Sequence, residues 1–482
     1  MFTTSTIVKS LFWKFTERCG TNGVQFVVSI VLARLLSPSD FGLIALVMVF
    51  ISLAYVFVQN GFNTALIQKK NADNLDFSSA LYTSLVIATA LYAILFFMAP
   101  ALAQFFEHPE LTTIVRVLAL MLIVGAVNSI QEAYIARNML FKKLFWRSLC
   151  ALVPSAVIGI TCAYKGFGVW ALVIQQLTDV LLMCVFMWFT VKWRPELKFS
   201  KASIKGLFSY GWKLQISALL DIGFTNLRNL IVGKMFSPTD LGYYSRGEIF
   251  PLAIIANINT SIQAVLMPTL SVAQDQPTAI KQMMRRAITT SSFVILPIMA
   301  GLAALAKPTV LLLLGEKWLP CVPFIQIFCF SYAFWPIHTS NLSAINAVGR
   351  SDIFLKLEII KKIMVLSVLA LFIYLFRSPI GIASTGFVTA IIAGFMNAYP
   401  NKKLLNYGYF EQIRDILPSM LLALAMGATI HYLSTFDFHP AIQLVSLTIF
   451  GTIFYLGIAK LLHFECLQYL VSTFKELLNA KR

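Results

Sequence analysis

Charged residues are scarce in this chain. Only 12% of its 482 residues are Asp, Glu, Lys or Arg, whereas 58% are hydrophobic. An average soluble protein is about one quarter charged, because its surface has to face water. Apolar stretches of about 20 residues, the length that crosses a bilayer as a helix, recur from one end of the sequence to the other. The composition therefore predicts an all-α polytopic membrane protein and excludes a soluble globular one.

The sequence also lacks the motifs of metal, redox and nucleotide chemistry. Its seven cysteines are scattered, with no Cys-x-x-Cys pair and no His/Cys cluster, so we expect neither a disulfide framework nor a metal site. A P-loop is absent, which excludes an ATP-driven pump within this chain. The outer gaps between apolar stretches are too short for a soluble catalytic domain. We therefore expect no enzymatic activity and no cofactor, with H⁺ or Na⁺ as candidate coupling ions.

Positive charge exceeds negative charge by a formal +17, which raises nucleic-acid binding as an alternative. A nucleic-acid-binding protein would gather its basic residues on one arm or domain. Here they form short clusters between apolar stretches, such as Arg137, Lys142, Lys143 and Arg147. Clusters of this kind mark the cytoplasmic loops of membrane proteins. We therefore expect a lipid bilayer as a partner, and no nucleic acid.

The apolar stretches predict about fourteen transmembrane helices. They lie near residues 11–36, 41–64, 79–106, 112–136, 148–164 and 167–191, then 208–235, 241–266, 287–314, 320–346, 352–376 and 380–399, and finally 416–434 and 440–462. Lys and Arg concentrate in the even-numbered gaps and near both ends of the chain. The positive-inside rule therefore predicts that both termini and the even-numbered gaps are cytoplasmic.

One short motif occurs twice in the chain. Ser37-Pro-Ser-Asp40 is followed by Phe-Gly, and Ser237-Pro-Thr-Asp240, 200 positions later, is followed by Leu-Gly. Each copy lies in a tight gap before a predicted helix. Ser at the N-cap, Pro at the first helical position and Asp at the third fit a capping box. We expect a structural role for both copies rather than a catalytic one.

The spacing of the two copies predicts how the chain is built. Six crossings separate them, and because six is even the two halves have the same orientation, as in a parallel repeat. The predicted fold is two six-helix lobes, residues 1–195 and 196–404, around a central cavity. Residues 405–482 would add two further helices and a basic C-terminal tail.

Polar residues run along matching faces of the first helix of each half. They recur every four residues, as Glu17, Thr21 and Gln25 in one helix and Ser217, Asp221 and Thr225 in the other. Such stripes are costly against lipid, so they favour a hydrated cavity between the lobes. Ordinary hydrogen bonding between packed helices is the alternative.

Charged residues within the apolar stretches are the candidate site residues, since each costs about 2.5–3.5 kcal/mol at the bilayer centre unless it is paired or hydrated. A cationic cavity suits an anionic headgroup such as a diphosphate, and the substrate-binding candidates are Arg18, Arg228, Arg246 and Lys361. A membrane carboxylate can couple protonation to conformation, and the ion-coupling candidates are Glu17, Asp179 and Asp221.

Other charged residues in these stretches have structural explanations. Glu132 lies near a predicted cytoplasmic helix end, where its side chain can reach the headgroups. Glu358 and Lys362 are four residues apart and can pair on one helix.

Several segments together resemble the bacterial polysaccharide flippases of the multidrug/oligosaccharidyl-lipid/polysaccharide exporter superfamily. The resemblance is carried by the order of "VLARLLSPSDFGLIAL", "ALIQKKNAD", "RPELKFS", "FSPTDLGYYSRGEIFPL" and "LLLGEKWLPCVPFIQIF" over most of residues 1–400. The last segment looks most like the branch of O-antigen, colanic-acid and other exopolysaccharide or lipopolysaccharide flippases.

The resemblance implies transport of an undecaprenyl-diphosphate-linked oligosaccharide from the cytoplasmic to the periplasmic leaflet of the bacterial inner membrane. It implies alternating access, coupling to an ion gradient, and polysaccharide polymerase or other assembly proteins as partners. Three alternatives stay open: a drug or small-molecule antiporter of the same superfamily, a membrane polysaccharide polymerase or ligase, and a non-transporting scaffold. The cationic candidates argue against the first, and the short outer gaps argue against the second.

Overall fold

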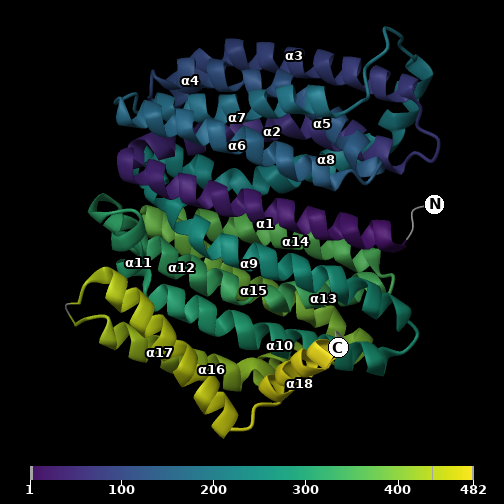
Figure 1. Cartoon of the computed structure of the whole chain (residues 1–482). Helices are drawn as coiled ribbons and strands as arrows, with labels where there is room; N and C mark the ends of the chain where they lie inside the picture. The colour runs from purple at the N-terminus through teal and green to yellow at the C-terminus, as the bar shows by residue number, and fades with distance from the viewer. Residues whose placement is uncertain (1–3, 437, 480–482) are drawn as a thin grey trace. The chain divides into compact units, whose positions relative to one another are not determined.

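The computed structural model describes residues 4–436 and 438–479. Side chains are described throughout these ranges except at residues 4–12, 15, 60, 61, 210, 213, 214, 474 and 477–479. Within the described residues all regular structure is helical, without a strand (Figure 1). The predicted all-α class is therefore confirmed.

Contacts divide the chain into two compact units, residues Met1–Gly242 and Tyr243–Arg482. The helices of the first unit are α1 (Thr4–Leu35), α2 (Pro38–Gln68), α3 (Asn74–Phe106), α4 (Leu111–Leu118), α5 (Leu120–Arg137), α6 (Phe141–Tyr164), α7 (Val169–Thr190) and α8 (Lys201–Met235). The first turn of α9 (Pro238–Val272) also belongs to it, and the rest of α9 belongs to the second unit.

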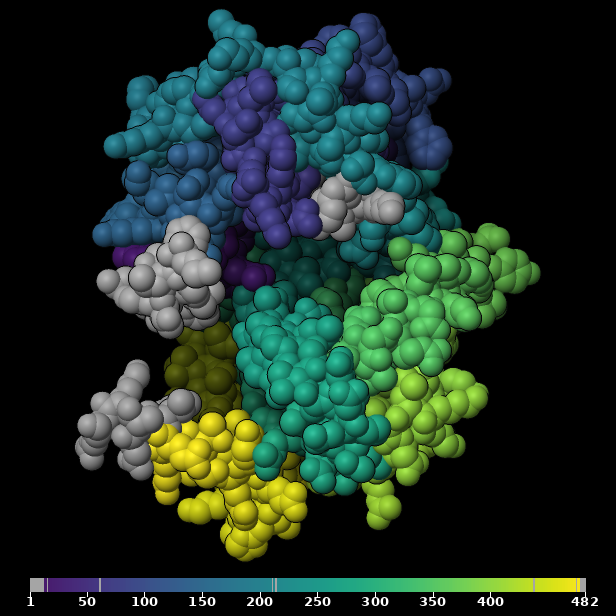
Figure 2. Space-filling model, turned by 90° about the vertical axis from the view of Figure 1, so that its right-hand side faces the viewer, coloured from purple at the N-terminus to yellow at the C-terminus, as the bar shows by residue number. Residues whose placement is uncertain are grey.

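The second unit continues with α10 (Pro277–Ala304), α11 (Ala306–Leu313), a 3₁₀ segment η1 (Glu316–Cys321), α12 (Val322–Ala333) and α13 (Trp335–Ala347). It ends with α14 (Ser351–Phe376), α15 (Pro379–Leu405), α16 (Tyr409–Leu433), α17 (Pro440–Leu461) and α18 (Glu465–Asn479). Helix α18 packs on α10 and α17. Figure 2 shows the C-terminal residues in yellow beside the teal segment that contains α10.

Twelve segments among the described residues are long and apolar enough to cross a membrane. They include every predicted span except the first and the seventh. Those two form α1 and α8, which have 32 and 35 residues but fall outside the apolar set and carry the polar stripes. The chain is therefore a multi-pass membrane protein in which two long helices are distinctly polar.

Several helices extend beyond the predicted spans into basic sequence. Helix α6 begins at Phe141 rather than 148, and α10 begins at Pro277 rather than 287. A hydropathy window detects only the apolar part of a helix, whereas backbone hydrogen bonding continues through polar turns. As a consequence, Arg147, Arg285 and Arg286 lie inside helices and not in loops.

Helix α8 belongs to the first unit because it forms polar contacts with α2 and with both ends of α3 along its length. At its start, the Ser203 hydroxyl donates to Asp76. In the middle, Gln215 Nε2 donates to the Phe57 carbonyl oxygen at 3.2 Å, and at the end Lys234 Nζ pairs with Glu107 at 2.9 Å. The two compact units are defined by contacts. The predicted lobes 1–195 and 196–404 and the added residues 405–482 are defined by the internal repeat, and they stay a prediction.

A buried amide cluster joins three helices of the second unit. Asn341 of α13 donates to Gln412 of α16 at 2.8 Å, and Asn401 of α15 donates to Asn341 at 2.7 Å. All three side chains are fully buried. Because buried amides are costly unless they are hydrogen-bonded, this cluster fixes the register of α13, α15 and α16.

Candidate functional site

Both copies of the repeated motif form the predicted capping box. Asp40 accepts from the Ser37 backbone N–H at 2.9 Å, and Asp240 accepts from the Ser237 backbone N–H at 3.2 Å. In return, each serine hydroxyl accepts from the backbone N–H of its aspartate, at 3.3 and 3.1 Å. The two carboxylates are engaged in starting α2 and α9, which confirms the structural interpretation.

Five of the seven candidate site residues lie in the first unit. Glu17 on α1 pairs with Lys14 at 3.0 Å, and its side chain is 14% exposed. Arg18 follows it in the chain and is exposed. Asp179 on α7 is half-buried and accepts from the Ser155 hydroxyl at 3.4 Å. On α8, Asp221 is exposed and Arg228 is half-buried. Among the described residues, Glu17 is the ion-coupling candidate for which an ion pair is observed.

An additional acid–base cluster surrounds Glu17. Glu132 of α5 is half-buried and lies within electrostatic reach of Lys14, Glu17 and Arg147. Arg147 of α6 is only 3% exposed. From the sequence we expect the Glu132 side chain to reach the lipid headgroups. The three charged neighbours observed here are not part of that expectation. Arg147 is predicted to lie in a loop because the predicted helix begins at residue 148. In the structure α6 begins at Phe141, so Arg147 lies within the helix.

The remaining two candidates lie in the second unit. Arg246 of α9 is 5% exposed, and its guanidinium lies 5.9 Å from the ring centre of Trp318. Lys361 of α14 pairs with Glu358 at 2.5 Å. The sequence suggested Lys362 as the partner of Glu358, so the observed pair has a spacing of three rather than four residues. Both spacings place side chains on one helix face. Lys361 is thus partly neutralised.

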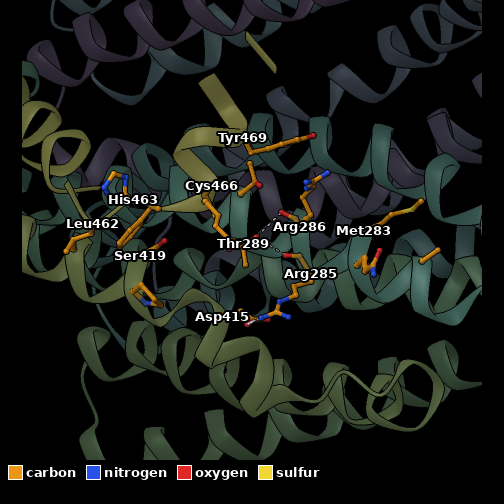
Figure 3. A pocket seen from close by; sticks show the side chains of 16 residues that line it. Met283, Arg285, Arg286, Thr289, Asp415, Ser419, Leu462, His463, Cys466 and Tyr469 are labelled. Atoms are coloured by element: carbon orange, nitrogen blue, oxygen red, sulfur yellow. Dashed lines mark hydrogen bonds and ion pairs between the residues drawn. The ribbon is translucent and has the colours of Figure 1, made fainter. Parts of the chain in front are cut away.

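A polar pocket of about 960 Å³ opens between α10, α16 and the start of α18 (Figure 3). Arg285 meets Asp415 at 2.5 Å, and Asp415 also accepts from the Tyr407 hydroxyl at 2.7 Å. The Arg286 guanidinium lies 4.2 Å from the ring centre of Tyr469 on α18. Burial raises the pKa of the Cys466 thiol on the same helix, which keeps it protonated. The pocket therefore offers hydrogen-bond donors, and its cysteine is present as a thiol.

An apolar pocket of about 530 Å³ lies further along the same helices. It is lined by Phe293 and Pro297 of α10, Met426 of α16, Tyr455 of α17 and Leu467 of α18, among others. Helix α18 contributes to both pockets, with Cys466 and Tyr469 in the polar one and Leu467 and Leu470 in the apolar one. Their succession along α10 suits an amphiphile with a polar head and a hydrocarbon chain. Neither pocket is predicted from the sequence, because residues after 462 lack a stretch long enough to span a membrane and are expected to form a tail.

Comparisons with known proteins agree with the resemblance seen in the sequence. The succinoglycan biosynthesis transport protein ExoT of Rhizobium meliloti (strain 1021) is 21% identical over 453 residues, which are 93% of this chain and 92% of that protein. The lipopolysaccharide biosynthesis protein WzxC of Escherichia coli (strain K12) is 23% identical over 404 residues, which are 82% of this chain and 79% of that protein.

A solved structure shares the fold. The lipid II flippase MurJ, in an inward closed conformation, superposes with a TM-score of 0.72 at 16% identity and covers 95% of this chain and 99% of that chain. Finally, residues 31–323, more than half of the chain, match the family described as "Polysaccharide biosynthesis protein". The chain belongs to the polysaccharide biosynthesis protein family.

Proposed function

We propose that this protein flips an undecaprenyl-diphosphate-linked oligosaccharide from the cytoplasmic to the periplasmic leaflet by alternating access, for lipopolysaccharide or exopolysaccharide synthesis. One observation carries the proposal from the structure: a polar pocket of about 960 Å³ and an apolar pocket of about 530 Å³ follow each other along α10. Ligand pockets of this size are typical of small-molecule sites. A lipid-linked saccharide has both a polar part and a hydrocarbon part to place in them.

The relatives support the same substrate class. ExoT and WzxC carry names of succinoglycan transport and lipopolysaccharide biosynthesis, and each aligns over most of this chain. The polar pocket also fits binding better than catalysis. Its Asp415 is paired with Arg285 and its Cys466 thiol is protonated, so neither side chain is arranged as a free base or nucleophile. We therefore propose a transporter rather than a polymerase or ligase.

The proposal extends to location and energy source. The protein would lie in the bacterial inner membrane, and the basic loops support cytoplasmic termini. Polysaccharide polymerase and other assembly proteins would be its partners there. The transport step would be coupled to an H⁺ or Na⁺ gradient. Arg18, Arg228, Arg246 and Lys361 line neither pocket, so we propose them as contacts to the diphosphate outside the two pockets along α10. Glu17, Asp179 and Asp221 are the proposed ion-coupling groups.

A deletion strain tests the proposal in cells. If the glycan pathway is otherwise intact, loss of the protein should make lipid-linked repeat units accumulate on the inner leaflet, and the wild-type gene should reverse this. Absence of accumulation would contradict the flippase proposal. Altered drug sensitivity with normal levels of lipid-linked units would favour the antiporter instead.

A further inference from the structure

The cluster around Glu132 and Arg147 in the first unit combines two unsatisfied charged groups. Arg147 is 3% exposed, and its Nε donates to the Lys143 carbonyl oxygen at 2.8 Å. Its other two nitrogens, Nη1 and Nη2, are buried and have no hydrogen-bond partner among the described residues. Glu132 lies within electrostatic reach of this guanidinium without forming an ion pair or accepting a hydrogen bond from a described side chain.

Protonation and deprotonation of Glu132 would favour two different arrangements of this cluster. A buried guanidinium with free N–H groups is costly, and a half-buried carboxylate without a partner is also unfavourable. If Glu132 is protonated, it is neutral and Arg147 must find water or another acceptor. If Glu132 loses its proton, the carboxylate and the guanidinium attract each other strongly in the low-dielectric interior. Proton loss therefore favours a movement that brings α5 and α6 closer at this level.

We propose that Glu132 is the proton-coupling carboxylate of this transporter and that Arg147 is the partner it holds when deprotonated. The proton is taken from water on one side of the membrane and returned to water on the other, so no covalent bond other than the carboxyl O–H forms or breaks. The coupling part of this inference rests on the proposed flippase function. It adds Glu132 to the candidates Glu17, Asp179 and Asp221.

The surroundings of Glu132 fit this role. Lys14 and Glu17 of α1, Tyr55 of α2 and Arg147 of α6 lie within electrostatic reach of it. The acids on the other long helices that pack on α5 have partners of their own: Asp76 of α3 pairs with Lys69, and Asp179 of α7 accepts from Ser155. Glu132 thus has both positive and negative neighbours. A small movement of α1 or α6 changes its distances to these charges and therefore its affinity for a proton.

The same surroundings select a proton over Na⁺. The guanidinium of Arg147 and the ammonium of Lys14 would repel a bound metal ion. A proton needs only the carboxylate itself.

Infrared spectroscopy of the purified protein tests protonation without any transport assay. Over an experimental window of about pH 5 to 9, the C=O band of a protonated carboxyl should change with pH in wild-type protein and be missing from Glu132→Gln. It should titrate at higher pH in Arg147→Gln, which removes the positive charge, and stay near the wild-type midpoint in Arg147→Lys. Wild-type and Glu132→Gln spectra that are identical across this range would overturn the inference.

Transport in proteoliposomes tests coupling. With a labelled lipid-linked oligosaccharide, a pH gradient should accelerate leaflet transfer by wild-type protein, and an equal Na⁺ gradient should not. Whatever its rate without a gradient, Glu132→Gln should show no acceleration by a pH gradient. The matched control Glu110→Gln, at an exposed glutamate directly before α4 whose side chain caps no helix, should keep the acceleration. Acceleration of Glu132→Gln by a pH gradient would overturn the assignment.

The two tests separate this inference from the flippase proposal. Wild-type protein that transfers no substrate would contradict the flippase proposal, and the infrared titration would then decide alone whether Glu132 exchanges a proton. Wild-type protein that transfers substrate but ignores a pH gradient would overturn the coupling role.

Discussion

Gly42 and Gly242 hold the two copies of the repeated motif in reciprocal backbone contact within the first unit. A Cβ atom added to Gly42 would lie 1.7 Å from the Pro238 carbonyl oxygen, and one added to Gly242 would lie 2.0 Å from the Pro38 carbonyl oxygen. This reciprocity is what a local two-fold relation between the first turns of α2 and α9 produces. It agrees with the parallel repeat that the spacing of the motif predicts.

Alanine at either glycine should therefore destabilise the protein. Neither neighbour is a movable side-chain tip, so the Gly42→Ala and Gly242→Ala variants must separate two backbones, and overpacking of this kind costs about 1–3 kcal/mol or more. Both should melt at a lower temperature in detergent than wild-type protein. Gly206→Ala, where an added Cβ meets nothing within 4 Å, is the control, and equal melting of all four proteins would refute the close contact.

The capping boxes should contribute stability and no chemistry. Replacing Ser37 or Ser237 by alanine removes one acceptor for a helix N-terminal N–H and should cost about 0.5–2 kcal/mol. Transfer of substrate per folded molecule should stay unchanged. Asp40→Asn keeps a side-chain oxygen acceptor, so it should be milder still. Loss of transport in Asp40→Asn at an unchanged melting temperature would instead indicate a direct role for the carboxylate.

Tyr407 should stabilise the polar pocket in a pH-dependent way. Burial, together with its hydrogen bond to Asp415, raises the pKa of this phenol above its ordinary value of 10.0. Folding thus favours the protonated phenol, so its contribution is complete below about pH 10 and is lost as the pH rises further.

Melting curves of Tyr407→Phe can detect this contribution. The variant leaves Asp415 with one partner fewer and should lose about 1.5–3 kcal/mol at neutral pH, the usual value of a hydrogen bond to a charged group. The difference from wild-type protein should shrink above pH 10. Tyr164→Phe, at a tyrosine that is 80% exposed, should melt like wild-type protein at both pH values.

The apolar pocket should tolerate no large side chain if it receives hydrocarbon. Thr448 of α17 lines this pocket, whereas Ser446, two residues earlier on the same helix, does not. Thr448→Phe should therefore slow transfer of a lipid-linked substrate severalfold, and Ser446→Phe should have little effect. Both proteins are compared at equal folded amounts in proteoliposomes. Equal rates for the two variants would exclude the pocket from the transport path.

The sequence predicted the helical framework closely because hydropathy and capping are local signals. The span predicted at 352–376 is observed as α14, Ser351–Phe376, and both capping motifs begin helices where expected. The main omission is α18, whose apolar residues Leu467 and Leu470 lie three apart on one face. A stretch of 15 residues is too short for a span, so a search for spans passes over it.

The candidate site was less predictable because pairing depends on tertiary structure. For Glu358 the spacing rule allows both Lys361 and Lys362 as partners within α14, and the structure shows the ion pair with Lys361. Conversely, Glu132 and Arg147 belong to different helices, and no spacing rule connects them. The first turns of α6 are polar, so a hydropathy window does not detect them as part of a helix. Arg147 lies on these turns with its side chain buried, and its burial is therefore not predicted.

Leaflet transfer by the purified protein decides whether it is a flippase. The measurement uses proteoliposomes that contain a labelled undecaprenyl-diphosphate-linked oligosaccharide, with a reagent that reacts only with label on the outer leaflet. We expect the protein to increase the transfer rate well above that of protein-free vesicles, and a cationic drug to move no faster than without protein. Transfer that equals the protein-free rate, in preparations shown to be folded by their melting curve, would contradict the proposed function.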